Sequence, residues 1–314
     1  LKLYEDMGIK PVIAPEVEFY LVQKNIDPDY SLKPAVGRSG RQETARQSYS
    51  IDAVNEFNPV IDTLYSYCDA QGLDVDTLIH ESGAAQMEIN FLHGDALDLA
   101  DQVFVFKRTL RETALKHNIY ATFMAKPMQS EPGSSMHIHQ SFVDIKTGKN
   151  IFAGEKKGEY SEAFYHYMGG LQKYTPSAIS FYAPNVNSYR RFAPDISAPI
   201  NMKWGIDNRT AGLRVPYSSP EGTRIENRFP GADCNPYLAI AASLACGYIG
   251  LKNKIQPTKP TTGSASEDGE TVKVARTLEE GLRLLDDCPE LADIMGPLFI
   301  TAYTSVKRSE FETF

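Results

Sequence analysis

Glutamates and histidines on alternating stretches carry the chemistry that this sequence could perform. His137 and His139 are two residues apart in E-P-G-S-S-M-H-I-H-Q-S, and Glu16 and Glu18 are two apart in P-E-V-E-F-Y. Side chains two apart on a β-strand point to the same face. Such pairs suit a metal or phosphate site if matching groups from other strands meet them. Taken singly, each pair also fits a solvated strand face.

Two further stretches supply matching groups. Glu88 alternates with apolar residues in Q-M-E-I-N-F, and a short S-G-A-A link separates it from Glu81. Glu226 lies between two arginines in R-I-E-N-R-F. If these strands form one sheet, their carboxylates share one concave surface, and buried carboxylates without partners require cations. A carboxylate-rich site with an imidazole favours Mg²⁺ or Mn²⁺ over zinc.

Arginines crowd the stretch from 187 to 228, which contains Arg190, Arg191, Arg209, Arg214, Arg224 and Arg228. Arginines around a carboxylate suit phosphate recognition beside a metal, although the same pattern fits a self-neutralising row of salt bridges. Metal, phosphate and arginines together predict nucleotide-dependent phosphoryl transfer. No Walker A or protein-kinase motif is present, so the nucleotide site is of another type.

The composition narrows the class of protein. The chain has 314 residues, 42% of them hydrophobic and 23% charged, which is typical of a globular protein. A net charge of −8 argues against a nucleic-acid partner. No apolar run is long enough to cross a bilayer, and no signal peptide is recognised. The four cysteines show no metal-ligand spacing, which predicts reduced thiols in a cytoplasmic protein.

The elements that must position these residues follow from periodicity and capping signals. Strands are expected at 11–22, as a pair within 78–91, in the second half of 131–141, and at 212–216 and 224–229. Helices are expected at 52–72 (Asp52 as N-cap, Pro59 as a kink), 95–118, 161–174, 235–252, from a capping box at 277–280, and at 299–314. Residues 25–50 and 254–276 read as loops, and 144–154 as a hairpin. Both ends of the sequence read as parts of helices, so we expect a fragment of a longer protein.

Six ordered motifs identify a family resemblance. They are P-E-V-E-F-Y-L, H-E-S-G-A-A-Q-M-E-I, P-G-S-S-M-H-I-H-Q-S, N-S-Y-R-R-F-A-P, N-R-T-A-G-L-R-V-P and R-I-E-N-R-F-P-G-A-D-C-N-P-Y-L-A-I-A-A-S-L. Their order resembles the catalytic domain of the glutamine synthetase family across essentially the whole chain. The resemblance implies one catalytic domain over residues 1–314. Its fold would be α+β, with a curved antiparallel sheet that carries the site and helices packed behind it.

The resemblance also implies roles for individual residues. Glu18, Glu81 and Glu88 would hold one divalent ion, and Glu16, His137 and Glu226 a second, among two to three Mg²⁺ or Mn²⁺ ions. His139 and Ser141 would lie on the nucleotide side, with Arg209, Arg214 and Arg224 on the phosphates of ATP. Arg191 and Arg228, with Gly133 in the adjoining loop, would bind glutamate. The family activates the γ-carboxylate of glutamate as an acyl phosphate, which an amine then attacks.

Two departures from the family pattern concern the amine. Ser197 stands where glutamine synthetases have a glutamate that takes a proton from ammonium, and Pro132 replaces an asparagine. Together with G-R-S-G-R-Q-E-T-A-R-Q-S-Y-S-I-D-A-V-N-E-F, they make the chain look more like the γ-glutamylpolyamine (glutamylputrescine) synthetase branch. A glutamine synthetase that uses ammonia and a non-catalytic structural member of the family are the alternatives.

The family has a further N-terminal β-grasp domain that completes each active site from a neighbouring subunit, and this sequence does not contain it. If that domain is absent, the resemblance predicts no activity and no ordered ring. If it is present in the full protein, a dodecamer of two stacked hexameric rings is expected.

Overall fold

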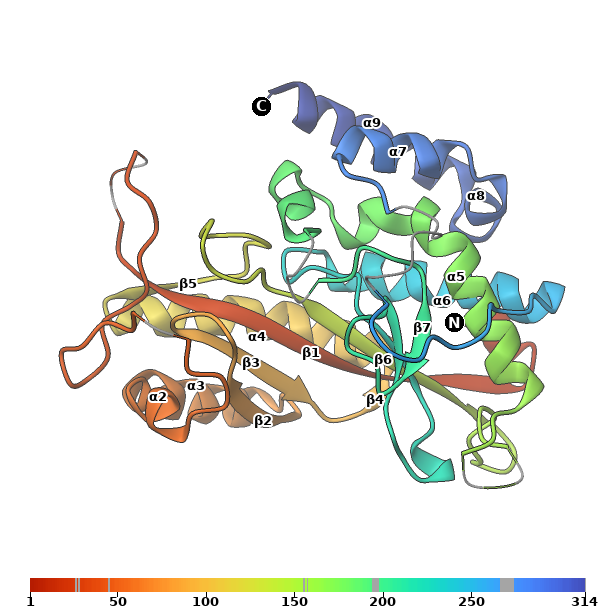
Figure 1. Cartoon of the computed structure of the whole chain (residues 1–314), viewed down its shortest axis with the longest axis horizontal. Helices are drawn as coiled ribbons and strands as arrows, with labels where there is room; N and C mark the ends of the chain where they lie inside the picture. Colours follow the sequence, from red (N-terminus) through yellow and green to blue (C-terminus); the bar gives the residue numbers. More distant parts are fainter. Residues whose placement is uncertain are drawn as a thin grey trace.

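The computed structural model describes residues 1–25, 27, 29–44, 46–154, 156, 158–193, 198–265 and 274–313. One sheet runs through the described part of the chain, in the strand order β2-β3-β1-β6-β9-β8-β7, with β4 and β5 also paired to β1 (Figure 1). The central strands are β1 (Ile9–Gln23), β3 (Gln86–Phe91), β6 (Met136–Asp144) and β9 (Ile225–Asn227). The expected α+β class with a site-bearing sheet is confirmed.

At one edge the sheet departs from the expected antiparallel pairing. β7 (Trp204–Ile206) and β8 (Leu213–Val215) pair in parallel, whereas β8 pairs antiparallel with β9. Parallel neighbours usually need a long crossover, which the sequence does not offer here. Instead the chain leaves β7 at Asp207, which has a positive φ of 46°, and returns to the sheet at Leu213.

One face of the sheet is apolar because the strands alternate. Val17 and Phe19 of β1, Met87 of β3 and Ile138 of β6 are each no more than 1% exposed. Helix α4 (Ala96–Lys116) covers this face, and Phe19 packs edge-on against its Phe106. The opposite face is left for the polar side chains of the same strands.

Helices form a second block beside the sheet. α5 (Glu162–Tyr182) packs on α6 (Pro236–Asn253), and α7 (Leu278–Asp286), α8 (Pro289–Met295) and α9 (Pro297–Thr313) lie together beyond them (Figure 1). The caps expected at Asp95 and Asn235 are confirmed, because each side chain accepts two backbone N–H groups of the first turn. α5 continues well past the expected end at Tyr174 and carries Pro176 in its interior.

The helix expected over 52–72 is two helices, α2 (Ile51–Asn55) and α3 (Asn58–Gln71). Ser50, not Asp52, caps α2 by accepting the N–H of Ala53. Pro59 does not kink a continuous helix; it lies in the first turn of α3, where its missing N–H leaves no bond unmade.

The remaining elements are short. They are α1 (Lys2–Glu5), β2 (Val75–His80), β4 (Gly94–Asp95), β5 (Ile119–Thr122) and the 3₁₀ turns η1 (Val186–Arg191) and η2 (Pro220–Gly222). The expected turn after β6 is present, with the N–H of Asp144 bonded to the carbonyl of Lys149. In the described residues, no helix combines the length and apolar character that a membrane span requires.

Candidate functional site

Strand pairing brings the predicted carboxylates and histidines side by side. Glu18 stands opposite Glu88 across β1 and β3, and Glu16 stands opposite His137 across β1 and β6. Directly opposed residues on one sheet face have their Cβ atoms about 4.5–5.5 Å apart. The polar face of the four central strands therefore forms a single cup of acidic and imidazole side chains, which we call the acidic cup.

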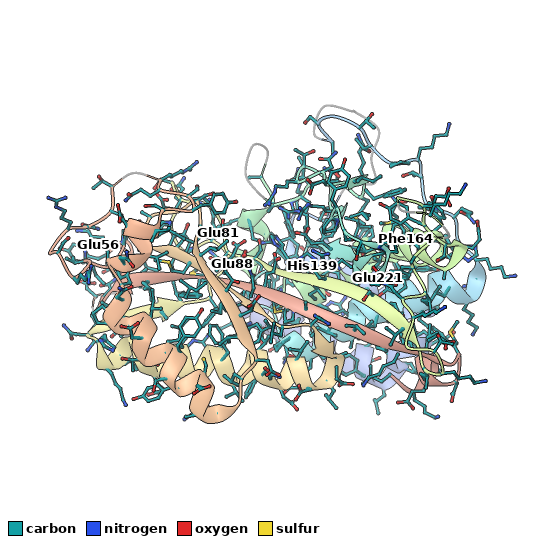
Figure 2. All side chains as sticks on the ribbon, turned by 90° about the horizontal axis from the view of Figure 1, so that it is seen from below. Glu56, Glu81, Glu88, His139, Phe164 and Glu221 are labelled. Carbon is teal, nitrogen blue, oxygen red and sulfur yellow. The ribbon has the colours of Figure 1, made fainter. Side chains whose placement is uncertain are left out.

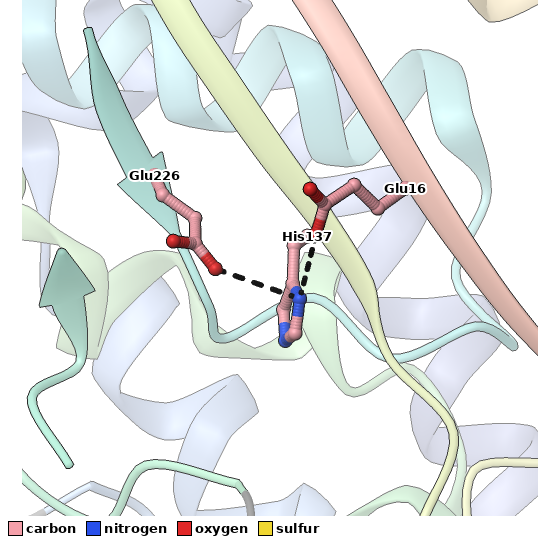
Figure 3. Close-up of side chains that lie close together, drawn as sticks. All are labelled: Glu16, His137 and Glu226. Carbon is pink, nitrogen blue, oxygen red and sulfur yellow. Dashed lines mark hydrogen bonds and ion pairs between the residues drawn. The ribbon is translucent and has the colours of Figure 1, made fainter. Parts of the chain in front are cut away.

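His137 lies at the centre of the acidic cup (Figure 3). Its Nδ1 is 3.2 Å from Oε2 of Glu16 and 3.6 Å from Oε1 of Glu226. Two groups of donor atoms lie within 4.8 Å of one another: Glu16, His137 and Glu226 form one, and Glu18, Glu88 and His137 the other. Glu16, His137 and Glu226, which were predicted to hold one ion, therefore lie together. Of the other predicted set, Glu18 and Glu88 lie with His137, and Glu81 is not in that group.

Glu81 directly follows the end of β2, and its charge acts on two carboxyl groups of the acidic cup. Burial and the charge of Glu81 raise the pKa of Glu18 to about 8. Burial, then the charges of Glu16, Glu18 and Glu81, raise the pKa of Glu88 to about 10. Glu81 and Glu88 are labelled next to each other in Figure 2. The part of the cup around Glu18, Glu81 and Glu88 is therefore short of positive charge.

In the part of the cup around Glu16 and Glu226, histidines and arginines offset the charge of the carboxylates. Burial would raise the pKa of Glu16, but hydrogen bonds from His137 and His139 outweigh it and hold the pKa below its ordinary value. Burial opposes ionisation of Glu226 as well, yet Arg228 and the histidines lower its pKa to about 2. Oε1 of Glu226 is 2.5 Å from Nη1 of Arg228, and Oε2 is 2.8 Å from Nη1 of Arg214.

The donor set fits a divalent cation on two grounds. Burial lowers the pKa of His137, which favours the neutral imidazole that binds metals. Its Nε2 is buried and has no hydrogen-bond partner within the described ranges. The carboxylates of Glu18 and Glu88 are 7% and 6% exposed and face each other. Carboxylate oxygens with one imidazole are the donors that Mg²⁺ and Mn²⁺ accept.

Arginines line the side of the cup that leads to β9. Nε of Arg224 donates to Nδ1 of His139 (3.1 Å), so the other nitrogen of this histidine carries its proton toward Glu16 at 2.8 Å. Arg214 also bonds Asp207. Arg209 is exposed; burial raises the pKa of Glu81, and the charge of Arg209 opposes that rise without cancelling it. Ser141 follows His139 on the same face of β6 and is partly buried.

Arg191 and Gly133 meet at the edge of the cup. Arg191 is 1% exposed, and its guanidinium donates to Oγ of Ser135 (2.9 Å) and to the carbonyl of Phe229. Burial lowers the pKa of Arg191 to about 10. A Cβ on Gly133 would lie 2.5 Å from Cγ of Arg191, so only glycine fits here. The structure thus joins this pair as expected, whereas Ser197 lies outside the described residues.

Two residues that the sequence reasoning did not single out complete this edge. Tyr20 donates to the carbonyl of Pro132 (2.8 Å), and Gln86 bonds both Glu18 and Gly133. The alternation of β1 and β3 already placed Tyr20 with Glu18, and Gln86 with Glu88, on the polar face. No motif showed that they reach the loop from 131 to 135, which we call the glycine loop.

Comparisons with known proteins agree with this geometry. Residues 1–314 match the family described as glutamine synthetase, catalytic domain. The chain is 35% identical over 311 residues to the γ-glutamylputrescine synthetase PuuA of Escherichia coli, covering 98% of this chain and 65% of that protein. It is 36% identical over 317 residues to a glutamate–isopropylamine ligase of a Pseudomonas species, covering 98% and 67%.

A glutamine synthetase of Pyrococcus abyssi is 35% identical over 316 residues, covering 98% of this chain and 69% of that protein. Among solved structures, one described as "Apo GmaS without ligand" superposes with a TM-score of 0.88 at 28% identity, covering 100% of this chain and 71% of that one. The chain thus spans about two thirds of the length of these curated relatives. It belongs to the glutamine synthetase family, whose catalytic domain it matches from its first residue to its last.

Proposed function

We propose that the chain is the catalytic part of an ATP-dependent ligase that joins the γ-carboxylate of L-glutamate to an amine. The observation that carries the proposal is the acidic cup: two groups of cation donors share His137 and lie beside Arg214, Arg224 and Arg228. Buried carboxylates that need cations, next to arginines that suit phosphates, form the arrangement required for transfer of a phosphoryl group. Alkylamine and polyamine ligases among the relatives support an amine acceptor.

The residues would divide the work as follows. The acidic cup would hold Mg²⁺ or Mn²⁺ through the side chains of Glu16, Glu18, Glu81, Glu88, His137 and Glu226. These ions would neutralise the phosphates and withdraw charge from the transferred group. Arg209, Arg214 and Arg224 would bind the phosphates of ATP, with His139 and Ser141 on the nucleotide side. Arg191, Arg228 and the backbone at Gly133 would bind glutamate.

The reaction would proceed in two displacements. An oxygen of the γ-carboxylate would attack the γ-phosphorus of ATP, and the bond to the bridging oxygen would break to release ADP. The amine nitrogen would then attack the acyl carbon and lose a proton to water, the carbon–oxygen bond to phosphate would break, and inorganic phosphate would leave with an amide formed. The arginines would hold both charged groups in line and make the encounter effectively intramolecular.

An amine panel tests the proposal. Release of ADP by the full-length protein would be measured with glutamate, Mg²⁺, ATP and either ammonia, isopropylamine, putrescine or a longer polyamine. Turnover that requires an alkylamine or a polyamine is the expected result. Turnover with ammonia alone would make the protein a glutamine synthetase. Cation binding without turnover of any amine would make it a structural member of the family.

The same proposal includes the location of the enzyme and its number of subunits. We expect a cytoplasmic homo-oligomer, a dodecamer of two hexameric rings, with no nucleic-acid or membrane partner. The net charge of −8 supports the lack of nucleic-acid binding. Native mass spectrometry of the full-length protein would measure the number of subunits.

A further inference from the structure

Gln86 occupies the junction between the acidic cup and the glycine loop. It is the first residue of β3, stands opposite Tyr20 of β1 and is 1% exposed. Its Nε2 donates to Oε2 of Glu18 (3.2 Å) and to the carbonyl of Gly133 (3.0 Å). Its Oε1 accepts from the N–H of Gly83 (2.9 Å) and lies 3.1 Å from the hydroxyl of Tyr20, whose single proton is shared with the closer carbonyl of Pro132. Both the NH₂ group and the oxygen of this buried amide are therefore bonded.

These partners allow only one orientation of the amide. Turning it over would bring its oxygen against the carbonyl of Gly133, which only accepts, and against Oε2 of Glu18, which already accepts the N–H of Ser135. It would also bring its NH₂ group against the N–H of Gly83, which only donates. The orientation of the Gln86 amide is thus fixed by the acceptors around its NH₂ group and by the donor at its oxygen.

Tyr20 adds a second contact to the loop. Its hydroxyl is fully buried and lies 2.8 Å from the carbonyl oxygen of Pro132. The space that it fills depends on Gly83, because a Cβ there would lie 2.0 Å from this hydroxyl. Two successive carbonyls of the loop, those of Pro132 and Gly133, are therefore held by a tyrosine and a glutamine of the sheet.

The same amide orients the carboxylate of Glu18. Oε2 of Glu18 accepts from Gln86 and from the N–H of Ser135 (2.8 Å), whereas Oε1 accepts no hydrogen bond in the part of the chain that the structure describes. Groups that hold one oxygen of a carboxylate direct the other toward a cation. A cation on Glu18 and the glycine loop would thus act on opposite sides of one amide.

We propose that Gln86 is a positioning residue that couples cation binding at Glu18 to the conformation of the glycine loop. A cation that holds the carboxylate of Glu18 fixes the Gln86 amide, which in turn fixes the carbonyl of Gly133. The consequence for glutamate rests on the function proposed above, because it assumes that this loop binds the substrate. The coupling of the cation to the loop does not depend on that assumption.

Hydrogen exchange of backbone amides tests the coupling without any substrate. Exchange in peptides covering 124–136 would be measured with and without Mg²⁺ in the wild-type protein, in Gln86→Met and in Gln102→Met. Gln102 is a matched control, since it is also buried and bonded through both amide atoms, but to Asp74 and Asp98. We expect Mg²⁺ to slow exchange of the loop about fivefold or more in the wild-type protein and in Gln102→Met. In Gln86→Met most of this protection is lost, whereas Mg²⁺ still raises the melting temperature.

Protection in Gln86→Met within twofold of wild type would overturn the proposal. If that variant does not fold, Tyr20→Phe replaces it, because it removes one hydroxyl and keeps the ring. Tyr20→Phe should bind Mg²⁺ with an affinity within twofold of wild type, while its loop loses part of the Mg²⁺-dependent protection. A loop that exchanges like that of the wild-type protein would contradict the coupling equally.

Kinetics separate this inference from the proposed function. In an active enzyme, Tyr20→Phe should raise the KM for glutamate by about tenfold, as for one lost hydrogen bond, and change kcat less. A tenfold loss in kcat with an unchanged KM for glutamate would contradict a positioning role for this loop. If no amine is turned over but the loop protection requires Gln86, the proposed function fails and the coupling stands.

Discussion

Glu18 and Glu88 face each other directly across β1 and β3, both buried; burial and the charge of Glu81 raise the pKa of Glu18, and burial with the charges of Glu16, Glu18 and Glu81 raises the pKa of Glu88. Directly opposed like charges destabilise a sheet. The pair is therefore a cost that a bound cation can remove. Several properties of the protein should follow from this and from the other buried groups.

Divalent cations should stabilise the fold through this pair. Mg²⁺ at a hundred times its dissociation constant adds about 2.7 kcal/mol to the free energy of unfolding. Glu88→Gln should be about as stable as the wild-type protein without cation, because the raised pKa of Glu88 already keeps it protonated near pH 7 and the amide keeps its shape, but it should lose most of the gain from Mg²⁺. Thermal unfolding with Mg²⁺ and with EDTA measures both effects. Glu112→Gln, at an exposed site on α4, serves as the control. A full Mg²⁺ gain in Glu88→Gln would contradict the assignment.

Arg191 and Arg190 offer a matched pair for testing burial. Arg191 is 1% exposed and holds Oγ of Ser135 and the carbonyl of Phe229, whereas Arg190 is exposed. Arg191→Met leaves buried acceptors without donors and should lower the free energy of unfolding by about 2 kcal/mol. Arg190→Met should stay within about 0.5 kcal/mol of wild type. Urea unfolding compares them, and equal effects would refute the importance of these bonds.

The cysteines should be unreactive in the folded protein. All four are free and buried, and burial raises the pKa of Cys68 to about 11 and of Cys234 to about 12. Because the thiolate is the reactive form, a raised pKa leaves these two thiols protonated at pH 8 and slows their modification. Ellman's reagent at pH 8 should therefore titrate the thiols only after urea is added, and raising the pH toward 10 should speed modification. Rapid labelling of Cys68 or Cys234 in the native protein would show that the sheet and helices open locally.

Ser197 offers a test of amine selectivity. If the serine in place of the proton-accepting glutamate is what disfavours ammonia, Ser197→Glu should raise kcat/KM for ammonia relative to putrescine by about tenfold, which is below the roughly 10²- to 10⁴-fold that a general base contributes. Ser197→Gln has the same size without the charge and should leave the ratio unchanged. Steady-state assays with both amines give the ratio. A shift in both variants alike would point to size rather than to charge.

The local sequence was sufficient for the strands and their faces. A side chain repeats its direction every two residues, so Glu16, Glu18, Glu88, His137 and Glu226 could each be assigned to the polar face of its own strand before any coordinates. Caps such as Asp95 and Asn235 were equally readable, because a cap acts within its own first turn. The motifs that carry the family resemblance also lie in these regular segments.

Contacts between segments far apart in the sequence could be identified only from the folded structure. Which carboxylates surround His137, the parallel pairing of β7 with β8, and the contacts of Gln86 with Glu18 and Gly133 all join residues that local periodicity cannot relate. The glycine loop has no period, and its position depends on hydrogen bonds from strands 47 or more residues away in the chain. Side-chain direction is a property of neighbouring residues, whereas proximity between distant segments depends on how the whole sheet twists and packs.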